Sequence, residues 1–292
     1  MMLSIVIATY NRSHTLQACL ASVLSQTDMG FEIIVVDDGS TDGTKDILAG
    51  FTDSRLRTVQ LPENKGASFA RNQGIKEAKG EYVLVWDSDD TLYPNALAFL
   101  RLLVEAHPDA IVVSVPARMM RGDKEVPFPV RTSGYVSLQQ TLCKYLGNNE
   151  KVRLARKDAY LKAPYVSRNV DFIVAARLAA QGQWFHSQEP LGDVFLDTPG
   201  SLTQGRKKFD YARSANRAPH LDAFLVDFGH ILKKECKARY VQIVYGTSIA
   251  CACAGMKAKA RMYACEVWKH APLSPRSYAA LLFSVLFPGR SH

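Results

Sequence analysis

The sequence predicts an α/β fold in which a parallel or mixed central sheet is flanked by helices and is followed by a helical C-terminal extension. Short β-branched runs alternate with amphipathic stretches over the first 115 residues, the pattern of strands joined by crossover helices. From about residue 205 the apolar residues follow a helical period instead. Hydrophobic residues make up 47% of the chain and charged residues 22%, which excludes a disordered or collagen-like protein.

The elements of the first 115 residues follow from apolar runs and from the residues that start and stop helices. The strands are runs rich in Val, Ile and Leu, and the helices begin near Ser, Thr or Asn and end near Gly or before Pro. The predicted strands are Leu3–Ala8, Glu32–Val36, Leu56–Leu61, Tyr82–Trp86 and Ala110–Val115. The predicted helices run from Ser13 as the N-cap to Gln26, from Thr41 to Ala49, over Ser68–Ala78 and over Asn95–Ala106.

The pattern weakens between about 116 and 165, where Pro116, Pro127, Pro129 and Gly134 interrupt any period. We expect loops there, with one helix near Leu138–Leu146. A helical period returns over 171–181 and ends at Gly182. The helices predicted for the C-terminal region are Leu221–Lys234, Arg239–Ala254, Lys257–His270 and Ser277–Phe287.

The N-terminus and the cysteines favour a cytoplasmic protein. No basic segment precedes the first apolar run and no apolar stretch reaches the roughly 18 residues that a membrane span needs, so we expect neither a signal peptide nor a spanning helix. The six cysteines show no C-x-x-C spacing, and we expect reduced thiols without a metal.

The positive charge is concentrated in the C-terminal third. Residues 1–204 hold 21 Lys and Arg against 23 Asp and Glu, a net −2, whereas residues 205–292 hold 15 against 5, a net +10. The apolar run Tyr278–Phe287 beside this charge is long enough to lie in a membrane interface, so an anionic membrane surface is one predicted partner. A solvated basic face that packs on the rest of the chain is the alternative. Nucleic acid is not an expected partner, because no zinc, RNP or recognition-helix pattern occurs.

Acidic turns follow two of the predicted strands. Asp37 and Asp38 come after the second strand, and Asp87, Asp89 and Asp90 come after the fourth. Ligands of open parallel sheets bind beyond the carboxyl ends of the strands. Five carboxylates at one edge repel each other unless a cation neutralises them, and carboxylate oxygens are the ligands of Mg²⁺ and Mn²⁺. The sequence therefore predicts a divalent metal at this edge.

Three further residues suit a nucleotide at the same edge. Tyr10 offers a flat face to a base and Asp38 an acceptor to a base N–H, while Arg71 lies where a helix begins after Gly66 and could meet an anion. Each of these residues also has a structural interpretation. The Tyr10 ring could seal the edge of the sheet, the turn could contain Asp because of the backbone conformation that it needs, and Arg71 could be a solvated charge on its helix. The chain has no G-x-G-x-x-G after the first strand, no P-loop and no G-x-S-x-G, which disfavours dinucleotide enzymes, P-loop ATPases and α/β-hydrolases.

Four motifs carry a resemblance to a known family. They are Ser4–Asn11 (SIVIATYN), Val35–Asp42 (VVDDGSTD), Asn64–Gly74 (NKGASFARNQG) and Gly80–Asp90 (GEYVLVWDSDD). In this order over about 90 residues they resemble the family 2 glycosyltransferases of the GT-A fold, and the resemblance continues more weakly to about residue 204.

The resemblance implies inverting, metal-dependent transfer of a hexose or N-acetylhexosamine from a UDP-sugar to an acceptor hydroxyl. The expected acceptor is a glycan or a lipid-linked saccharide of bacterial cell-surface polysaccharide or lipopolysaccharide assembly, on the inner face of the cytoplasmic membrane. Tyr10 and Asp38 would hold the uracil and Asp37 would support their turn. Asp87 would approach the ribose or the metal, and Asp89 with Asp90 would bind Mn²⁺ or Mg²⁺ on the diphosphate. The expected donor site is completed by Ala8, Gly66, Arg71 and Ser88.

The same resemblance assigns the general base. An inverting displacement needs a group that takes the acceptor proton, and Asp171 matches the second acid of the family's Glu-Asp pair. Val170 replaces the usual Glu, and Asp197 with Thr198 stand where many relatives carry a His. His186 is nearby, and we interpret it as structural.

These predictions imply a domain organisation with two parts. Residues 1–204 form the catalytic domain, with a nucleotide-binding half over 1–115 and an acceptor half over 116–204, and residues 205–292 form a basic helical region. Two alternatives remain open. The departures at Val170 and at the missing His would suit a UDP-sugar-binding scaffold that has lost catalysis. The other alternative is a nucleotidyltransferase. Such an enzyme would be expected to have a Gly-rich, basic loop directly after the first strand, and this chain lacks one.

Overall fold

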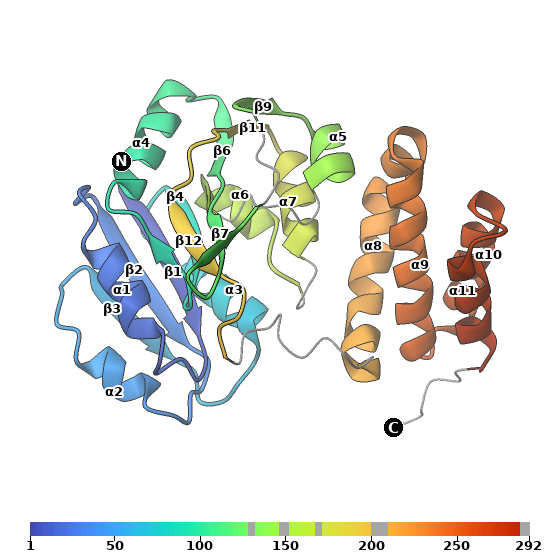
Figure 1. The fold of residues 1–292 in the computed structure, drawn as a ribbon, viewed down its shortest axis with the longest axis horizontal. Coiled ribbons are helices and arrows are strands. Elements are labelled where there is room, and N and C mark those ends of the chain that lie inside the picture. Colours follow the sequence, from blue (N-terminus) through green and yellow to red (C-terminus); the bar gives the residue numbers. More distant parts are fainter. Residues whose placement is uncertain (128–131, 146–151, 167–170, 200–209, 287–292) are drawn as a thin grey trace. The chain divides into compact units, whose positions relative to one another are not determined.

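The computed structural model describes the chain except residues 128–131, 146–151, 167–170, 200–209 and 287–292 (Figure 1). The chain divides into two compact units, which are described separately. The first comprises Met1–Thr141, Tyr145–Val166 and Val174–Gly205, and the second comprises Leu142–Lys144, Ser167–Ile173 and Arg206–His292.

The first unit is built on an eight-stranded sheet with the order β3-β2-β1-β4-β10-β6-β11-β9 (Figure 1). Neighbouring strands are parallel except at β10, which is antiparallel to both β4 and β6, and at β9, which is antiparallel to β11. The sheet is therefore mixed. The strands are β1 Leu3–Thr9, β2 Phe31–Asp37, β3 Leu56–Gln60, β4 Tyr82–Asp87, β6 Ala110–Val115, β9 Gly134–Val136, β10 Val152–Arg156 and β11 Gln183–His186.

Helices cover both faces of this sheet, because the residues of the central strands are apolar on both sides. Ile5 and Ile7 of β1 pack in one buried cluster with residues of α1 and α4, and Val6 packs in the other with residues of α3, α6 and α7. A Cβ on Gly74 of α3 would lie 2.3 Å from Val6 Cγ1, so glycine permits the close approach of α3 to β1. The helices of this region are α1 Leu16–Leu24, α2 Thr44–Ala49, α3 Ala67–Glu77, α4 Ala96–Ala106, α5 Leu138–Gln140, the π-helix Thr141–Tyr145, α6 Lys157–Lys162 and α7 Asp171–Ala179.

A second, four-stranded sheet has the order β5-β12-β7-β8, and its strands are β5 Thr91–Leu92, β7 Arg118–Arg121, β8 Lys124–Val126 and β12 Gly192–Phe195. The expectation of loops over the rest of 116–165 was therefore wrong, whereas the helix predicted near Leu138–Leu146 is confirmed by α5 and the π-helix that follows it. That segment contributes β7, β8, β9, β10 and α6. The strands in it have three to five residues, which is too short for a periodic pattern to reveal.

The second unit contains the predicted C-terminal helices, α8 Tyr211–Glu235, α9 Lys237–Cys253, α10 Lys257–His270 and α11 Pro275–Leu286. The predicted start of the first of them was wrong, because α8 begins at Tyr211 rather than Leu221. The Asp210 side chain caps α8 by accepting a hydrogen bond from the Arg213 N–H at 2.9 Å. The α/β fold with a helical C-terminal extension is thus confirmed.

Two networks of polar side chains connect the helices of this unit. Asp222 of α8 accepts hydrogen bonds from Lys259 Nζ at 2.6 Å and from the Tyr263 hydroxyl at 2.7 Å, both on α10. Glu266 of α10 accepts from Lys233 Nζ of α8 at 2.8 Å and from the Tyr240 hydroxyl of α9 at 3.0 Å. The bond from Lys233 outweighs the effect of burial and lowers the pKa of Glu266 to about 2.

The cysteines differ from the expectation of reduced thiols at one pair. Cys143 and Cys236 form a disulfide with their Cα atoms 5.5 Å apart, although 93 residues separate them in the sequence. Cys19, Cys251, Cys253 and Cys265 are free. Among the residues that the structure describes, no helix is both long enough and apolar enough to cross a membrane.

Candidate functional site

The polar turns that follow β1, β2 and β4 lie side by side at one edge of the sheet. These three strands are parallel, and their register pairs Thr9 with Asp37 and Ala8 with Asp87. The end of β1, which leads to Tyr10, therefore lies between the two acidic turns. The sequence prediction that these turns share one edge is confirmed.

The turns after β1 and β2 are joined by hydrogen bonds from a residue with unusual backbone geometry. Asn11 has a positive φ of 51°, a conformation that Asn tolerates better than most residues. Its side-chain oxygen accepts a bond from the Thr41 N–H at 2.9 Å, and its own N–H donates to Ser40 Oγ at 2.9 Å. Tyr10, just before it, is 39% exposed, so its ring is accessible from solvent.

The two acids at the end of β2, Asp37 and Asp38, are buried and hold the surrounding loops. Asp37 Oδ1 accepts from the Ser40 N–H at 3.1 Å. The two oxygens of Asp38 accept from the N–H groups of Lys65 and Gly66, each at 2.8 Å. Asp38 thereby fixes the loop that leads into α3, and each of its oxygens retains a further lone pair for a ligand.

The three acids after β4 form a compact group of oxygens. Asp87, Asp89 and Asp90 each offer a carboxylate oxygen, and these atoms all lie within 4.8 Å of one another. Asp90 is the most buried, at 2% exposure, and its Oδ1 also accepts from the Phe195 N–H at 3.0 Å. An all-oxygen, anionic donor set fits Mg²⁺ or Mn²⁺ rather than a soft metal. Ser88, between the first two acids, is buried.

Two arginines face this acid group. Arg71 Nη2 lies 2.7 Å from Asp87 Oδ1, and Arg12 Nη2 lies 3.6 Å from Asp89 Oδ2. Arg12 also donates to the carbonyl oxygen of Pro199 at 3.2 Å. The sequence predicts Arg71 as a donor-site residue but not Arg12, because nothing in the local pattern pairs residue 12 with residue 89.

A neutral thiol lies beneath the acid turn. Cys19 of α1 is 1% exposed, and its Sγ lies 3.5 Å from the carbonyl oxygen of Asp87, to which the S–H donates. Burial, followed by the negative charges of Asp90, Asp89 and Asp87, raises the pKa of the Cys19 thiol well above its ordinary value. Cys19 is therefore a protonated donor and not a nucleophile.

The predicted general base, Asp171, lies in the second unit. Asp171 is the first residue of α7 and its side chain is exposed. Val170, which precedes it, lies outside the described residues. The carboxylate of Asp171 therefore lies in the first turn of a helix, where a negative charge interacts favourably with the helix dipole.

The residues at and near the position where many relatives carry a His are part of the internal structure of the first unit. Asp197 Oδ2 accepts from the Gly122 N–H at 2.9 Å, at the turn between β7 and β8. Thr198 is buried. His186 is 1% exposed, and its Nδ1 lies 3.1 Å from Ser114 Oγ inside the sheet.

Comparisons with curated proteins find glycosyltransferases. The chain is 38% identical over 114 residues to the glycosyltransferase GlyG of Streptococcus pneumoniae, a match that covers 38% of each protein. It is 40% identical over 96 residues to the UDP-Glc:alpha-D-GlcNAc-diphosphoundecaprenol beta-1,3-glucosyltransferase WfgD of Escherichia coli, covering 33% of this chain and 38% of that protein. The matches thus span little more than a third of the length of these relatives.

The fold agrees with solved structures of this class. Residues 1–349 of S. aureus TarS in complex with UDP-GlcNAc superpose with a TM-score of 0.66 at 18% identity, covering 96% of this chain and 92% of that one. The family model described as Glycosyl transferase family 2 matches residues 4–159, which include all three polar turns of the sheet edge. This match spans more than half of the chain, and the protein therefore belongs to glycosyl transferase family 2.

Proposed function

We propose that this protein transfers a sugar from a UDP-sugar donor to an acceptor hydroxyl, with inversion at the anomeric carbon, in the assembly of a bacterial cell-surface glycan. The observation that carries the proposal is the group of Asp87, Asp89 and Asp90 oxygens at the sheet edge. This group lies beside the turns that suit a nucleoside, in a chain of family 2. The name of WfgD, which specifies a UDP-Glc donor, and the UDP-GlcNAc in the TarS complex support a uridine nucleotide.

In this proposal the turns after β1 and β2 bind the nucleoside. Tyr10 stacks on the uracil, and Asp38 uses its remaining lone pairs to accept the uracil N–H. Ala8, Gly66 and Ser88 line the rest of the donor site. Arg71 offers its positive charge to the diphosphate.

The metal would be held by Asp89 and Asp90, with Asp87 as a third ligand or as a partner of the ribose. A bound Mn²⁺ or Mg²⁺ supplies Lewis-acid stabilisation of the negative charge on the departing UDP. The arginines that face Asp87 and Asp89 hold these carboxylates in place. We assign this donor chemistry to residues 1–115 and acceptor binding to residues 116–204.

Asp171 is the proposed general base. It would take the proton of the acceptor hydroxyl as that oxygen attacks the anomeric carbon from the side opposite UDP. A single displacement of this kind inverts the configuration. The exposed position of Asp171 in the first turn of α7 supports the proposal, because a base for an incoming acceptor must be reachable from solvent.

The acceptor that we propose is a glycan or a lipid-linked saccharide, reached from the cytoplasmic face of the membrane. The name of WfgD specifies a diphosphoundecaprenol acceptor, which supports the lipid-linked alternative. In the second unit, Tyr278, Leu282 and Val285 of α11 follow a spacing of four and three residues and are 50%, 56% and 65% exposed. With the exposed Lys269 and Arg276 nearby, this stripe suits peripheral contact with an anionic bilayer.

The decisive experiment measures UDP release from a panel of UDP-sugars by the full chain, with Mn²⁺, with Mg²⁺ and with EDTA. We expect release from one donor, dependent on metal and lost in Asp89→Asn. Asp123→Asn, an exposed Asp in the turn between β7 and β8, is the matched control and should keep full activity. Metal-dependent UDP binding without any turnover would instead favour the scaffold alternative, and no UDP binding at all would reject the proposed donor.

The base assignment is tested separately with Asp171→Asn. We expect UDP to bind as in the wild type while transfer to acceptor falls at least about 100-fold, which is the low end for loss of a general base. Asp158→Asn is the control, because Asp158 is also an exposed acid in the first turn of a helix, α6. Full transfer by Asp171→Asn would remove Asp171 from the mechanism.

The membrane proposal is tested by flotation with vesicles of phosphatidylglycerol or of phosphatidylcholine at low salt. Binding should require the anionic lipid, fall as salt rises, and weaken in Leu282→Ser. Leu102→Ser changes a leucine of α4 that is equally exposed, at 61%, and should bind like the wild type. Equal flotation of both variants, or none by the wild type, would contradict the assigned surface.

A further inference from the structure

Asn72 joins two segments of the first unit that are 93 residues apart in the sequence. Its side-chain Nδ2 donates to the carbonyl oxygen of Tyr165 at 2.7 Å, and its Oδ1 accepts from the Tyr165 N–H at 2.9 Å. Asn72 therefore satisfies both backbone groups of one residue in the way that a neighbouring β-strand would. The backbone of Tyr165 is thereby fixed against the first turns of α3.

The ring of Tyr165 in turn lies beside Arg71, the residue that precedes Asn72. Arg71 Cζ is 5.2 Å from the centroid of the ring, within the range of a cation–π interaction. Tyr165 is 6% exposed and the Arg71 side chain is 13% exposed, so water screens the contact little. Tyr160 supports the ring from another side, with centroids 6.2 Å apart and planes 20° from parallel.

The third link connects Arg71 to the acid group. Arg71 Nη2 donates to Asp87 Oδ1 at 2.7 Å. An arginine side chain has four rotatable bonds and needs more than one contact to stay in a single conformation. Here the ring of Tyr165 and the carboxylate of Asp87 hold the guanidinium between them.

We propose that Tyr165, held by Asn72, is a positioning residue that fixes the Arg71 guanidinium on Asp87 and so sets the affinity of the site for the nucleoside diphosphate. The inference rests on the proposed function, because it assumes that UDP binds at this sheet edge. It assigns Tyr165 a role through Arg71 and no contact with the donor.

The test is a double-mutant cycle on UDP affinity, measured by calorimetry with Mn²⁺ on the full chain. Tyr165→Leu should weaken UDP binding by about 3- to 30-fold, the range of a partly desolvated cation–π contact. Tyr165→Phe keeps the ring and should stay within about twofold of the wild type. In an Arg71→Ala background Tyr165→Leu should cause no further loss, because its effect passes through Arg71.

Asn72→Ala is a second variant in case Tyr165→Leu does not fold. It keeps the ring but frees the Tyr165 backbone, so it should weaken UDP binding in the same direction and should also lose its effect in Arg71→Ala. Tyr135→Leu, at a tyrosine that is 49% exposed on β9, is the matched control and should bind UDP normally. Thermal unfolding of each variant shows whether it is folded.

The possible outcomes separate the inference from the proposed function. If the wild type does not bind UDP, the proposed donor is wrong and the inference fails with it. If the wild type binds UDP and Tyr165→Leu is folded and binds equally well, only the inference fails. The loss of UDP affinity in the double variant could also equal the product of the losses in Tyr165→Leu and Arg71→Ala. That result would show that Tyr165 acts by a route other than Arg71, and it would overturn the inference.

Discussion

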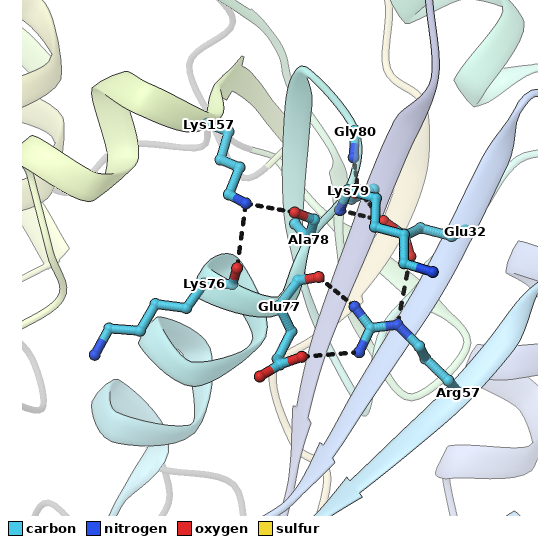
Figure 2. A network of polar contacts seen from close by, with 9 residues as sticks. Glu32, Arg57, Lys76, Glu77, Ala78, Lys79, Gly80 and Lys157 are labelled. Carbon is cyan, nitrogen blue, oxygen red and sulfur yellow. Dashed lines mark hydrogen bonds and ion pairs between the residues drawn. The ribbon is translucent and has the colours of Figure 1, made fainter.

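The two ends of the same parallel strands carry acid–arginine groups that are built differently. At the amino ends of β1, β2 and β4, Glu32 accepts from Ser4 Oγ at 2.7 Å and from the Lys79 N–H at 2.5 Å, and Arg57 Nε lies 3.4 Å from its other oxygen (Figure 2). At the carboxyl ends three carboxylates crowd together and face Arg12 and Arg71.

The amino-end network is closed by the chain itself. The Gly80 N–H donates to Ser4 Oγ at 2.8 Å, and Arg57 also donates to the carbonyl oxygen of Glu77 at the end of α3. Lys157 Nζ bonds the carbonyl oxygens of Lys76 and Ala78 at 3.1 and 2.5 Å, as Figure 2 shows. These contacts satisfy polar groups where α3 ends and β4 begins. One acid in this network serves several donors.

The difference teaches how to separate a structural acid from a ligand-binding one. Glu32 is a single carboxylate whose oxygens are committed to donors of the chain, so its removal leaves those donors unsatisfied. Asp87 and Asp89 are mutually repelling carboxylates that crowd together and face Arg71 and Arg12. Substitution at the amino end should therefore change stability, and substitution at the carboxyl end should change activity.

The largest expected effect is at the carboxyl end. Asp87→Asn should reduce metal-dependent UDP release at least about 100-fold, because a proposed ligand and the anchor of Arg71 are lost together. Its free energy of unfolding should change by less than about 1 kcal/mol, since the lost ion pair with Arg71 is offset by reduced repulsion within the acid group. Activity and denaturant unfolding measured on one preparation check both parts, and a large loss of stability would contradict the contrast.

The next effect is at the amino end. Glu32→Ala should lower the free energy of unfolding by about 2–3 kcal/mol, because it leaves the Ser4 hydroxyl and the Lys79 N–H without their acceptor. UDP affinity should stay within about twofold. Glu81→Ala removes an exposed glutamate that lies 3.8 Å from Arg156 and should cost less than about 1 kcal/mol. If Glu32→Ala were no more destabilising than this control, the amino-end network would not be structural.

A smaller effect concerns pH. Burial raises the pKa of Glu32, but the hydrogen bonds from Ser4 and Lys79 and the charge of Arg57 outweigh it and leave the pKa below the ordinary value of 4.5. A lowered folded-state pKa gives stability that is fully present above about pH 4.5 and is lost as the pH falls through the folded-state pKa. The wild type should therefore lose more stability than Glu32→Gln on acidification below that pH, as thermal unfolding at a series of pH values would show. Parallel curves for the two proteins would refute the linkage.

The smallest effect is expected at Lys157. Lys157→Ala removes a cation and two hydrogen bonds from the C-terminal carbonyls of α3, and should cost about 0.5–1 kcal/mol. Lys157→Arg keeps the charge and should recover part of the loss. Chemical denaturation of both variants measures the difference, and a loss as large as that of Glu32→Ala would mean that Lys157 has a larger role than capping.

The central strands and the acid turns could be predicted because their signals are local. The predicted strands at Leu3–Ala8, Glu32–Val36 and Tyr82–Trp86 each end within one residue of the observed strands. An apolar run that is buried on both faces is visible without knowledge of its neighbours. The acids that follow such a run are visible for the same reason.

The missed features depend on partners that are distant in the sequence. β10, with arginines at Arg153 and Arg156, has no long apolar run, and it becomes a strand because β4 and β6 lie on either side of it. The contact of Asn72 with Tyr165 and the disulfide of Cys143 and Cys236 each span 93 residues. A single sequence carries no local signal for such pairs, since tertiary context decides them.

The position of β10 also sets the order in which the chain can fold during synthesis. β4 is complete at Asp87, but its outer neighbour is β10, which begins at Val152. In a nascent chain that has emerged only to residue 115, β4 is therefore an open edge with unpaired backbone groups. β6 has been made by then, but β10, which joins it to the sheet, has not. The acid turn at the end of β4 thus acquires its rigid support only after some 65 further residues are made, a delay of about 3–13 s at ordinary translation rates. Until then the open edge of β4 is able to pair with a strand of another chain.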